Sequence, residues 1–179
     1  TAREFVSAAG KLGADASLVT MVPRRNHGVE PPDAVAAAMA AAPVAVLLAS
    51  TSLTHTVARR RATERGVRIA SMPGPDLRRL EFLLDLDYDE LKQRGEEIAA
   101  FLRRGRRVRL RNAAGTDLSF DIQGRPVFVD CGDLGSPGAF GNLPAGEVCL
   151  APIEGTADGV LMVDGSIGGT GKVTTPVRL

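Results

Sequence analysis

Val44-Ala-Val-Leu-Leu-Ala49 is a continuous apolar run. Such a run is typical of a strand buried on both faces of a parallel sheet. Outward from it, the sequence predicts two more strands, at 16–22 and 67–72. It predicts helices before each strand, over residues 2–13, 31–42 and 55–65. Helix and strand therefore alternate, which predicts an α/β fold with a Rossmann-like parallel sheet and flanking helices.

The region after Gly105 has a different character. Residues 76–104 are predicted to be helical in two segments. Short stretches that alternate with period two follow them, separated by Gly and Pro turns, at 108–110, 118–122 and 127–129. We therefore predict a Rossmann-like α/β domain over residues 1–105, with its first strand missing, and a β-rich, loop-rich segment over residues 106–179.

The composition is that of an ordinary soluble globular protein, with 44% hydrophobic and 24% charged residues and a formal net charge of +1. The near-zero charge argues against a nucleic-acid partner. No apolar run approaches the roughly 20 residues that span a bilayer, so no membrane partner is expected. Cys131 and Cys149 are the only cysteines and match no zinc or redox motif. Free thiols of this kind indicate a reducing, cytoplasmic compartment.

Charge is distributed unevenly along the second part of the chain. Between Pro126 and Gly171 there is no Lys or Arg. The same segment contains carboxylates at Asp130, Asp133, Glu147, Glu154, Asp158 and Asp164. Hard divalent cations prefer oxygen ligands, so the segment could host a cation. On composition alone, solvated loop carboxylates are the favoured interpretation.

Several common motifs are missing. The glycine-rich stretch 165–171 lacks the spacing of a phosphate loop, and no GxGxxG follows the first two predicted strands, so no dinucleotide cofactor is expected. No serine lies in a GxSxG elbow.

His27 and His55 are the only histidines, and each follows a predicted parallel strand. That position predicts that both lie at the carboxyl edge of the sheet, where open α/β folds bind ligands. Two histidines cannot by themselves form a histidine-rich metal centre.

The most specific motif is Asn142-Leu-Pro-Ala-Gly-Glu147-Val, followed by Ala151-Pro152 and Glu154-Gly-Thr156. Three supporting stretches precede it, Gly28-Val-Glu-Pro-Pro32, Ser52-Leu-Thr-His-Thr56 and Ala114-Gly-Thr-Asp-Leu118. Together they resemble the N-terminal part of the aminopeptidase T-like metallopeptidases, also called leucyl aminopeptidases, over nearly the whole chain.

This resemblance implies a metallo-aminopeptidase with a peptide substrate, in which Glu147 is the first metal ligand and residues 106–179 begin the metal-binding catalytic domain. It implies two divalent ions of the Zn, Co or Mn type, bridged by a water that they activate. It also implies a homodimer and places His55 in the substrate pocket. The remaining ligands of that family lie further along its sequence, and Tyr88 is not one of them. We therefore expect a fragment that is inactive alone.

Two alternatives stay open. A related branch, the 2,5-dihydroxypyridine dioxygenases, shares the Ser-Leu-Thr-His-Thr element. It implies an acid/base role for His55 and a non-heme iron site of two histidines and one carboxylate, in which Glu147 would be dispensable. The other alternative is a structural module without chemistry.

Overall fold

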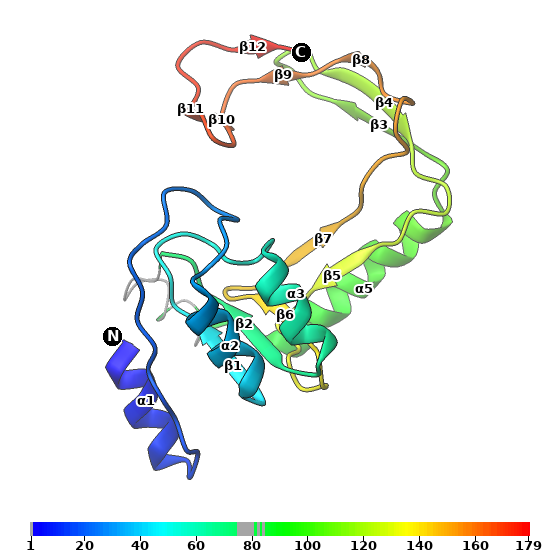
Figure 1. Ribbon diagram of the computed structural model, residues 1–179. Coiled ribbons are helices and arrows are strands. Elements are labelled where there is room, and N and C mark those ends of the chain that lie inside the picture. Colours follow the sequence, from blue (N-terminus) through cyan, green and yellow to red (C-terminus); the bar gives the residue numbers. More distant parts are fainter. Residues whose placement is uncertain (1, 75–80, 82, 84) are drawn as a thin grey trace. The chain divides into compact units, whose positions relative to one another are not determined.

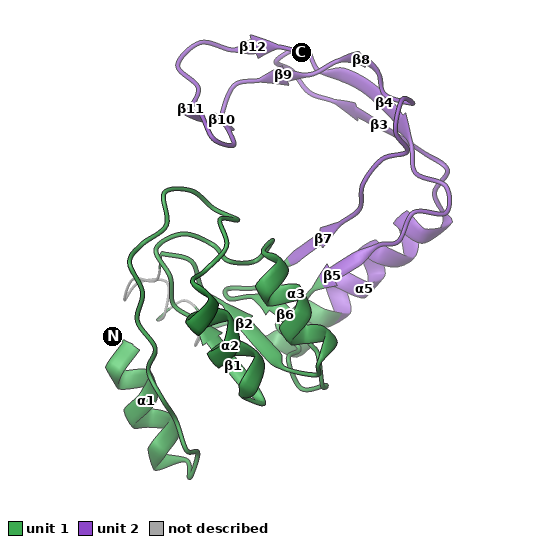
Figure 2. Ribbon diagram, viewed as in Figure 1, with its two compact units in different colours: residues 1–92, 130–146 green, residues 93–129, 147–179 purple. Residues whose placement is uncertain are grey.

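The computed structural model describes residues 2–74, 81, 83 and 85–179, and it has a mixed α/β fold (Figure 1). Its residues group into two compact units (Figure 2). The first contains Thr1–Lys92 and Asp130–Gly146, and the second contains Gln93–Val129 and Glu147–Leu179. Each unit is described by itself. Within the described residues, none of the helices combines the length and the apolar character needed to cross a bilayer.

A three-stranded parallel sheet lies in the first unit. Its strands are, in spatial order, β1 (Val44–Leu47), β2 (Arg68–Ser71) and β6 (Phe140–Asn142). Both pairs are parallel, with Val46 beside Ala70 and Ser71 beside Asn142. The central strand is the most buried, and its Ile69 is 0% exposed.

The helices of this unit are α1 (Ala2–Lys11), α2 (Asp33–Ala41) and α3 (Val57–Glu64). Met39 of α2 and Ala62 of α3 join Ile69 in the hydrophobic core, together with Leu53 and Val67. Burial of this apolar surface is the main force that holds the two helices to the sheet. By contrast, α1 has no buried residue.

Two expectations for this unit are wrong. The apolar run 16–22 forms no strand, because none of the described strands pairs with it and Val19 and Val22 remain exposed. Conversely, β6 completes the parallel sheet although no parallel strand was predicted within residues 106–179. The first helical segment predicted after Gly74 falls largely on residues 75–80, 82 and 84, which lie outside the described residues.

The second unit is built from most of α5 (Tyr88–Arg104) and from short strands. An antiparallel sheet has the order β3 (Arg107–Arg111), β4 (Asp117–Asp121) and β8 (Asp158–Val160). Three two-stranded sheets pair β5 (Phe128–Asp130) with β7 (Glu147–Cys149), β9 (Met162–Val163) with β12 (Val177–Arg178), and β10 (Ser166–Ile167) with β11 (Gly171–Lys172).

Close packing of α5 depends on Gly95. A Cβ at this position would lie 2.8 Å from Cγ1 of Val129, well inside van der Waals contact. The glycine therefore allows the helix backbone to approach this part of the unit closely.

Candidate functional site

Three polar side chains, two of them buried and one half-buried, meet where the strands of the parallel sheet end. The Thr54 hydroxyl lies 2.9 Å from the Ser71 hydroxyl and donates to Oδ1 of Asn142 at 3.2 Å. A hydroxyl has a single proton, so Ser71 donates to Thr54, which in turn donates to Asn142. Ser71 ends β2, Asn142 ends β6 and Thr54 lies in the loop after β1. The hydrogen bonds therefore connect all three carboxyl ends, at the edge where open α/β sheets bind ligands.

Asp130 anchors the stretch that begins with Asn142. Its carboxylate is 5% exposed and accepts a hydrogen bond from the Asn142 N–H at 2.7 Å. Its carbonyl oxygen accepts another from the Gly146 N–H at 2.8 Å. Gly141 permits this arrangement, because a Cβ there would lie 2.6 Å from Oδ1 of Asp130. The Leu143–Pro144 bond in this stretch is cis.

His55 is exposed between two threonines that are buried. Thr54 is 6% and Thr56 is 2% exposed. The Thr56 hydroxyl donates to the Leu53 carbonyl oxygen at 2.7 Å and accepts from the Arg59 N–H at 3.2 Å, which caps α3. The backbone on both sides of His55 is thus fixed, while its ring faces solvent.

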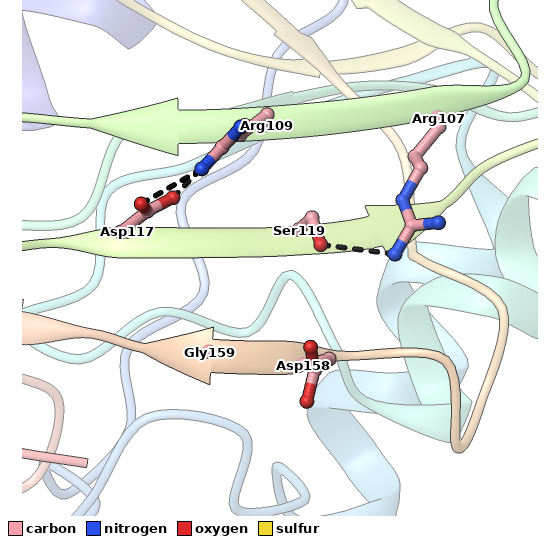
Figure 3. A pocket seen from close by; sticks show the side chains of 6 residues that line it. All are labelled: Arg107, Arg109, Asp117, Ser119, Asp158 and Gly159. Atoms are coloured by element: carbon pink, nitrogen blue, oxygen red, sulfur yellow. Dashed lines mark hydrogen bonds and ion pairs between the residues drawn. The ribbon is translucent and has the colours of Figure 1, made fainter.

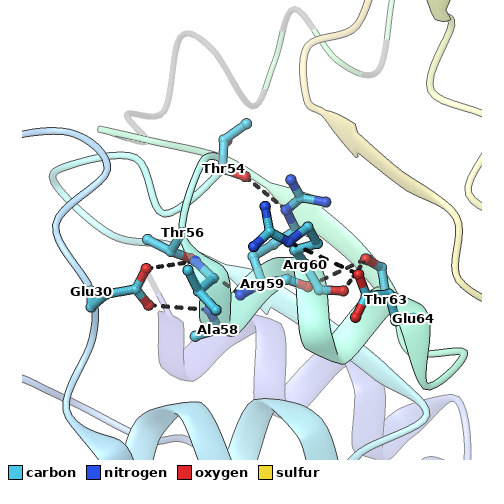
Figure 4. A network of polar contacts seen from close by, with 9 residues as sticks. Glu30, Thr54, Thr56, Ala58, Arg59, Arg60, Thr63 and Glu64 are labelled. Carbon is cyan, nitrogen blue, oxygen red and sulfur yellow. Dashed lines mark hydrogen bonds and ion pairs between the residues drawn. The ribbon is translucent and has the colours of Figure 1, made fainter.

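Arg59 also holds this loop (Figure 4). Its Nε donates to the Thr54 carbonyl oxygen at 2.7 Å, and its guanidinium lies over the Phe140 ring, 4.1 Å from the centroid. Partial burial, followed by the neighbouring charge of Arg60, lowers the pKa of Arg59. The group remains a cation, because guanidinium groups are not deprotonated in proteins.

Residues 27–30 bind to the loop that carries His55. Nδ1 of His27 accepts from the Ser52 N–H at 2.9 Å, and the Gly28 N–H donates to the Ser52 carbonyl oxygen at 2.9 Å. The Glu30 carboxylate accepts from the N–H groups of Val57 and Ala58, at 2.5 and 3.1 Å, in the first turn of α3 (Figure 4). Hydrogen bonds, rather than a preceding strand, thus bring His27 to this edge.

Glu147, the proposed metal ligand, begins β7 in the second unit and is exposed. Two other carboxylates of its segment form ion pairs elsewhere. Asp133 pairs with Lys92 at 2.7 Å, and Glu154 pairs with Arg125. Among the described residues, no group of three or more His, Cys, Asp or Glu side chains could hold a metal ion. These residues therefore do not form a complete metal site.

A charged depression of about 510 Å³ lies on the antiparallel sheet (Figure 3). Arg109 binds the Asp117 carboxylate with two hydrogen bonds of 2.8 Å, and Arg111 adds a contact of 3.3 Å. These bonds hold the pKa of Asp117 well below its usual value. Because the side chains are about half exposed and paired with each other, we interpret the depression as a solvated surface.

Sequence reasoning did not identify Thr54 or Ser71 as site residues, and it named Asp130 only as one of six carboxylates in a segment that could host a cation. Thr54 and Asn142 both lie within motifs found in the sequence, so the motifs could have identified them as site residues. Ser71 is the next-to-last residue of the strand predicted over residues 67–72, and polar residues near the carboxyl end of a parallel strand often lie at ligand sites.

Comparison with known proteins points to a different family from the one that the motifs suggested. The sequence pattern of the family described as NicX, 2,5-dihydroxypyridine 5,6-dioxygenase, matches residues 1–170. The solved structure of 2,5-dihydroxypyridine dioxygenase from Pseudomonas putida KT2440 superposes with a TM-score of 0.69 at 23% identity, which shows a shared fold. The match covers 88% of this chain and 48% of that one, so the chain spans about half its length. No curated protein matches.

These findings correct several predictions. The aminopeptidase T-like assignment is wrong, and with it the classification as a hydrolase or protease, because the matching family is a dioxygenase family. The pair of Zn, Co or Mn ions is wrong for the same reason, since ring-cleaving dioxygenases of the two-histidine, one-carboxylate type use non-heme iron. The roles of His55 and Glu147 and the homodimer stay predictions.

Proposed function

Because the chain belongs to the NicX family of 2,5-dihydroxypyridine 5,6-dioxygenases, we propose that it works in an enzyme that opens a dihydroxypyridine ring with molecular oxygen. The family match over residues 1–170 carries this proposal. In such a reaction both atoms of O2 enter the product as the ring bond between C5 and C6 breaks. Non-heme iron would supply the one-electron chemistry that lets O2 react with a closed-shell ring.

The sheet edge supports a substrate site of the Rossmann-like kind predicted from the sequence. Three parallel strands end there, and α2 and α3 contribute core residues beside them. The loop after β1 brings His55 to this edge as an exposed ring next to a rigid, hydrogen-bonded backbone. A flat, polar aromatic substrate suits an edge of this kind, because backbone and hydroxyl groups can bind its ring substituents.

We infer that His55 is the acid/base residue. A histidine ring can accept the proton of a ring hydroxyl near neutral pH, and removing that proton makes the ring more electron-rich and easier to oxidise. The fixed threonines on either side reduce the conformational freedom that the ring would lose on reaching the substrate.

We further propose that Glu147 supplies the carboxylate of the iron site. This replaces the expectation that Glu147 would be dispensable in the dioxygenase branch. Its support is chemical: the site needs one carboxylate, and Glu147 is exposed at the end of a stretch anchored by Asp130. The described residues do not complete the site, so its histidines would come from elsewhere in the protein, and no reaction step is assigned to iron.

The test uses the full-length protein that carries this chain, loaded with Fe(II) without oxygen. After air is admitted with 2,5-dihydroxypyridine, we expect one O2 to be consumed per substrate molecule. An oxygen electrode measures the O2 consumption, and the loss of the ring's ultraviolet absorbance measures the substrate consumption. Hydrolysis of leucyl amides without oxygen uptake would refute the proposal, and so would an inert dihydroxypyridine.

Two variants assign the residues. His55→Gln should lower kcat by about 100- to 10,000-fold, the usual contribution of a general acid or base. The matched control is His27→Asn, whose amide oxygen can replace the Nδ1 acceptor. Glu147→Gln should lower the iron content of the purified protein, whereas Glu154→Gln should leave it unchanged. Full iron loading of the Glu147→Gln variant would remove Glu147 from the site.

A further inference from the structure

Thr54 uses every polar group it has. Its N–H donates to the Ser52 hydroxyl at 3.1 Å, and its carbonyl oxygen accepts from Nε of Arg59 at 2.7 Å. Its hydroxyl connects Ser71 with Asn142. These contacts come from the loop itself, from α3, from β2 and from β6.

The chemistry at Thr54 is more specific than core packing requires. A residue that is 6% exposed and serves only to fill space could be Val, which has nearly the same shape. Here the hydroxyl is both donor and acceptor in a chain that runs from Ser71 to Asn142. Removing it would leave two partner groups without a hydrogen bond in a part-buried site, which is costly.

Thr54 and His55 are the two central residues of a turn, which is closed by a hydrogen bond from the Thr56 N–H to the Leu53 carbonyl oxygen at 3.1 Å. The Thr54 side chain is held inward by its hydrogen bonds, whereas His55 is exposed. Figure 4 shows the Thr54 carbonyl bound by Arg59 and the Thr56 side chain at the start of α3. The hydrogen bonds on both sides of His55 therefore fix the position of its backbone, from which the ring extends.

We propose that Thr54 is a positioning residue for His55, acting through its hydrogen bonds to Ser71, Asn142 and Arg59. The inference rests on the proposed acid/base function of His55. We further infer that the ends of β2 and β6 control the geometry of the His55 loop. A substitution at either strand end should therefore alter the position of the His55 ring.

The first test needs no enzymatic activity. In the histidine-labelled full-length protein, the variants His55→Gln and His27→Asn assign the imidazole NMR signals of the two histidines of this chain, and His27 serves as the internal reference. Thr54→Val should shift the His55 ring signals, while Thr54→Ser, which keeps the hydroxyl, should stay close to wild type. Thr63→Val is the matched control, because its hydroxyl bonds only to α3 carbonyls.

Unchanged His55 signals in a folded Thr54→Val variant would overturn the proposal, as would a Thr54→Ser shift of equal size. If Thr54→Val does not fold, Ser71→Ala takes its place. That variant removes the Ser71–Thr54 bond and keeps the Thr54–Asn142 bond, so it should shift the His55 signals while the protein stays folded. No shift at His55 would again refute the inference.

The second test measures catalysis by the full-length protein. Thr54→Val should lower kcat by about 10- to 100-fold with KM changed less than about twofold, because misplacement of a catalytic group mainly affects the chemical step. Thr54→Ser should restore most of kcat. If wild type consumes no dihydroxypyridine, the proposed function fails, whereas the NMR result still decides whether Thr54 positions His55.

Discussion

Substitution of Gly141 by Ala tests the anchoring of the Asn142 stretch directly. The new Cβ would lie 2.6 Å from Oδ1 and 3.3 Å from Cγ of Asp130. The backbone of β6 cannot easily move away, because its residues pair with Ile69, Ala70 and Ser71 of β2. The Asp130 carboxylate must therefore move, and its 2.7 Å hydrogen bond with the Asn142 N–H breaks.

The free-energy cost follows from these two events. Overpacking of a tight site costs about 1–3 kcal/mol, and loss of a hydrogen bond to a charged group costs about 1.5–3 kcal/mol. We expect Gly141→Ala to lower the free energy of unfolding by about 3–5 kcal/mol, near the upper end for a single substitution. Urea unfolding followed by circular dichroism measures this difference. The control is Gly165→Ala, where a Cβ meets nothing within 4 Å.

A double-mutant cycle isolates the cause. In an Asp130→Ala background the obstacle is gone, so Gly141→Ala should cost less than about 1.5 kcal/mol there. Equal costs of Gly141→Ala in both backgrounds would refute the reasoning, because the clash with Asp130 would then contribute nothing.

Three other predictions follow from single contacts. Hydrogen bonds from Arg109 and Arg111 lower the pKa of Asp117 from 3.8. The stabilising effect of this carboxylate is therefore complete above pH 3.8 and declines as the pH falls below it. Carboxyl NMR should show a titration midpoint below 3.8 that rises in the Arg109→Ala variant. Glu30→Ala should lower the free energy of unfolding by about 0.5–2 kcal/mol in thermal melts, since it removes the acceptor for two N–H groups of α3. The control Glu64→Ala breaks only an exposed contact with Arg60 and should change the free energy of unfolding by less than about 0.5 kcal/mol. Gly159→Ala should speed amide exchange in β4 and β8, because its φ of +120° disfavours a side chain and the Cβ would collide with the Asp117 carbonyl; unchanged exchange, as expected for Gly168→Ala, would contradict this.

The parts of the fold that the sequence predicted are those with a local signal. The apolar run that begins at Val44 predicted β1, and the period-two alternation predicted β3 and β4. By contrast, β6 contains only Phe140, Gly141 and Asn142, and nothing in such a short stretch indicates that it pairs with a strand some 70 residues earlier. The apolar run 16–22 shows the opposite error, because strand composition forms a strand only where a partner strand is available.

The site depended even more on contacts between distant residues. Asp130 was one of six carboxylates in a segment without Lys or Arg, and composition gave no reason to separate it from the others. Its role comes from the missing side chain of Gly141, which lets the carboxylate reach the Asn142 N–H. The motif marked Asn142 through Glu147 as important, but it pointed to the exposed Glu147 and not to the buried group that anchors the stretch.

This distribution of contacts explains why the motifs suggested the wrong chemistry. Most residues of Ser52–Thr56 and Asn142–Gly146 form hydrogen bonds that build the edge of the sheet, among them Thr54 to Asn142 and Gly146 to Asp130. An edge built in this way can serve a peptidase or a dioxygenase equally well, because function resides in the groups added to a fold. His55 and Glu147 are the exposed residues of the two motifs whose side chains can take part in catalysis, and either residue type is compatible with both reactions. The remaining metal ligands decide between zinc-type hydrolysis and iron-dependent oxygenation. The evidence that separates the two families therefore had to come from the pattern of the whole chain.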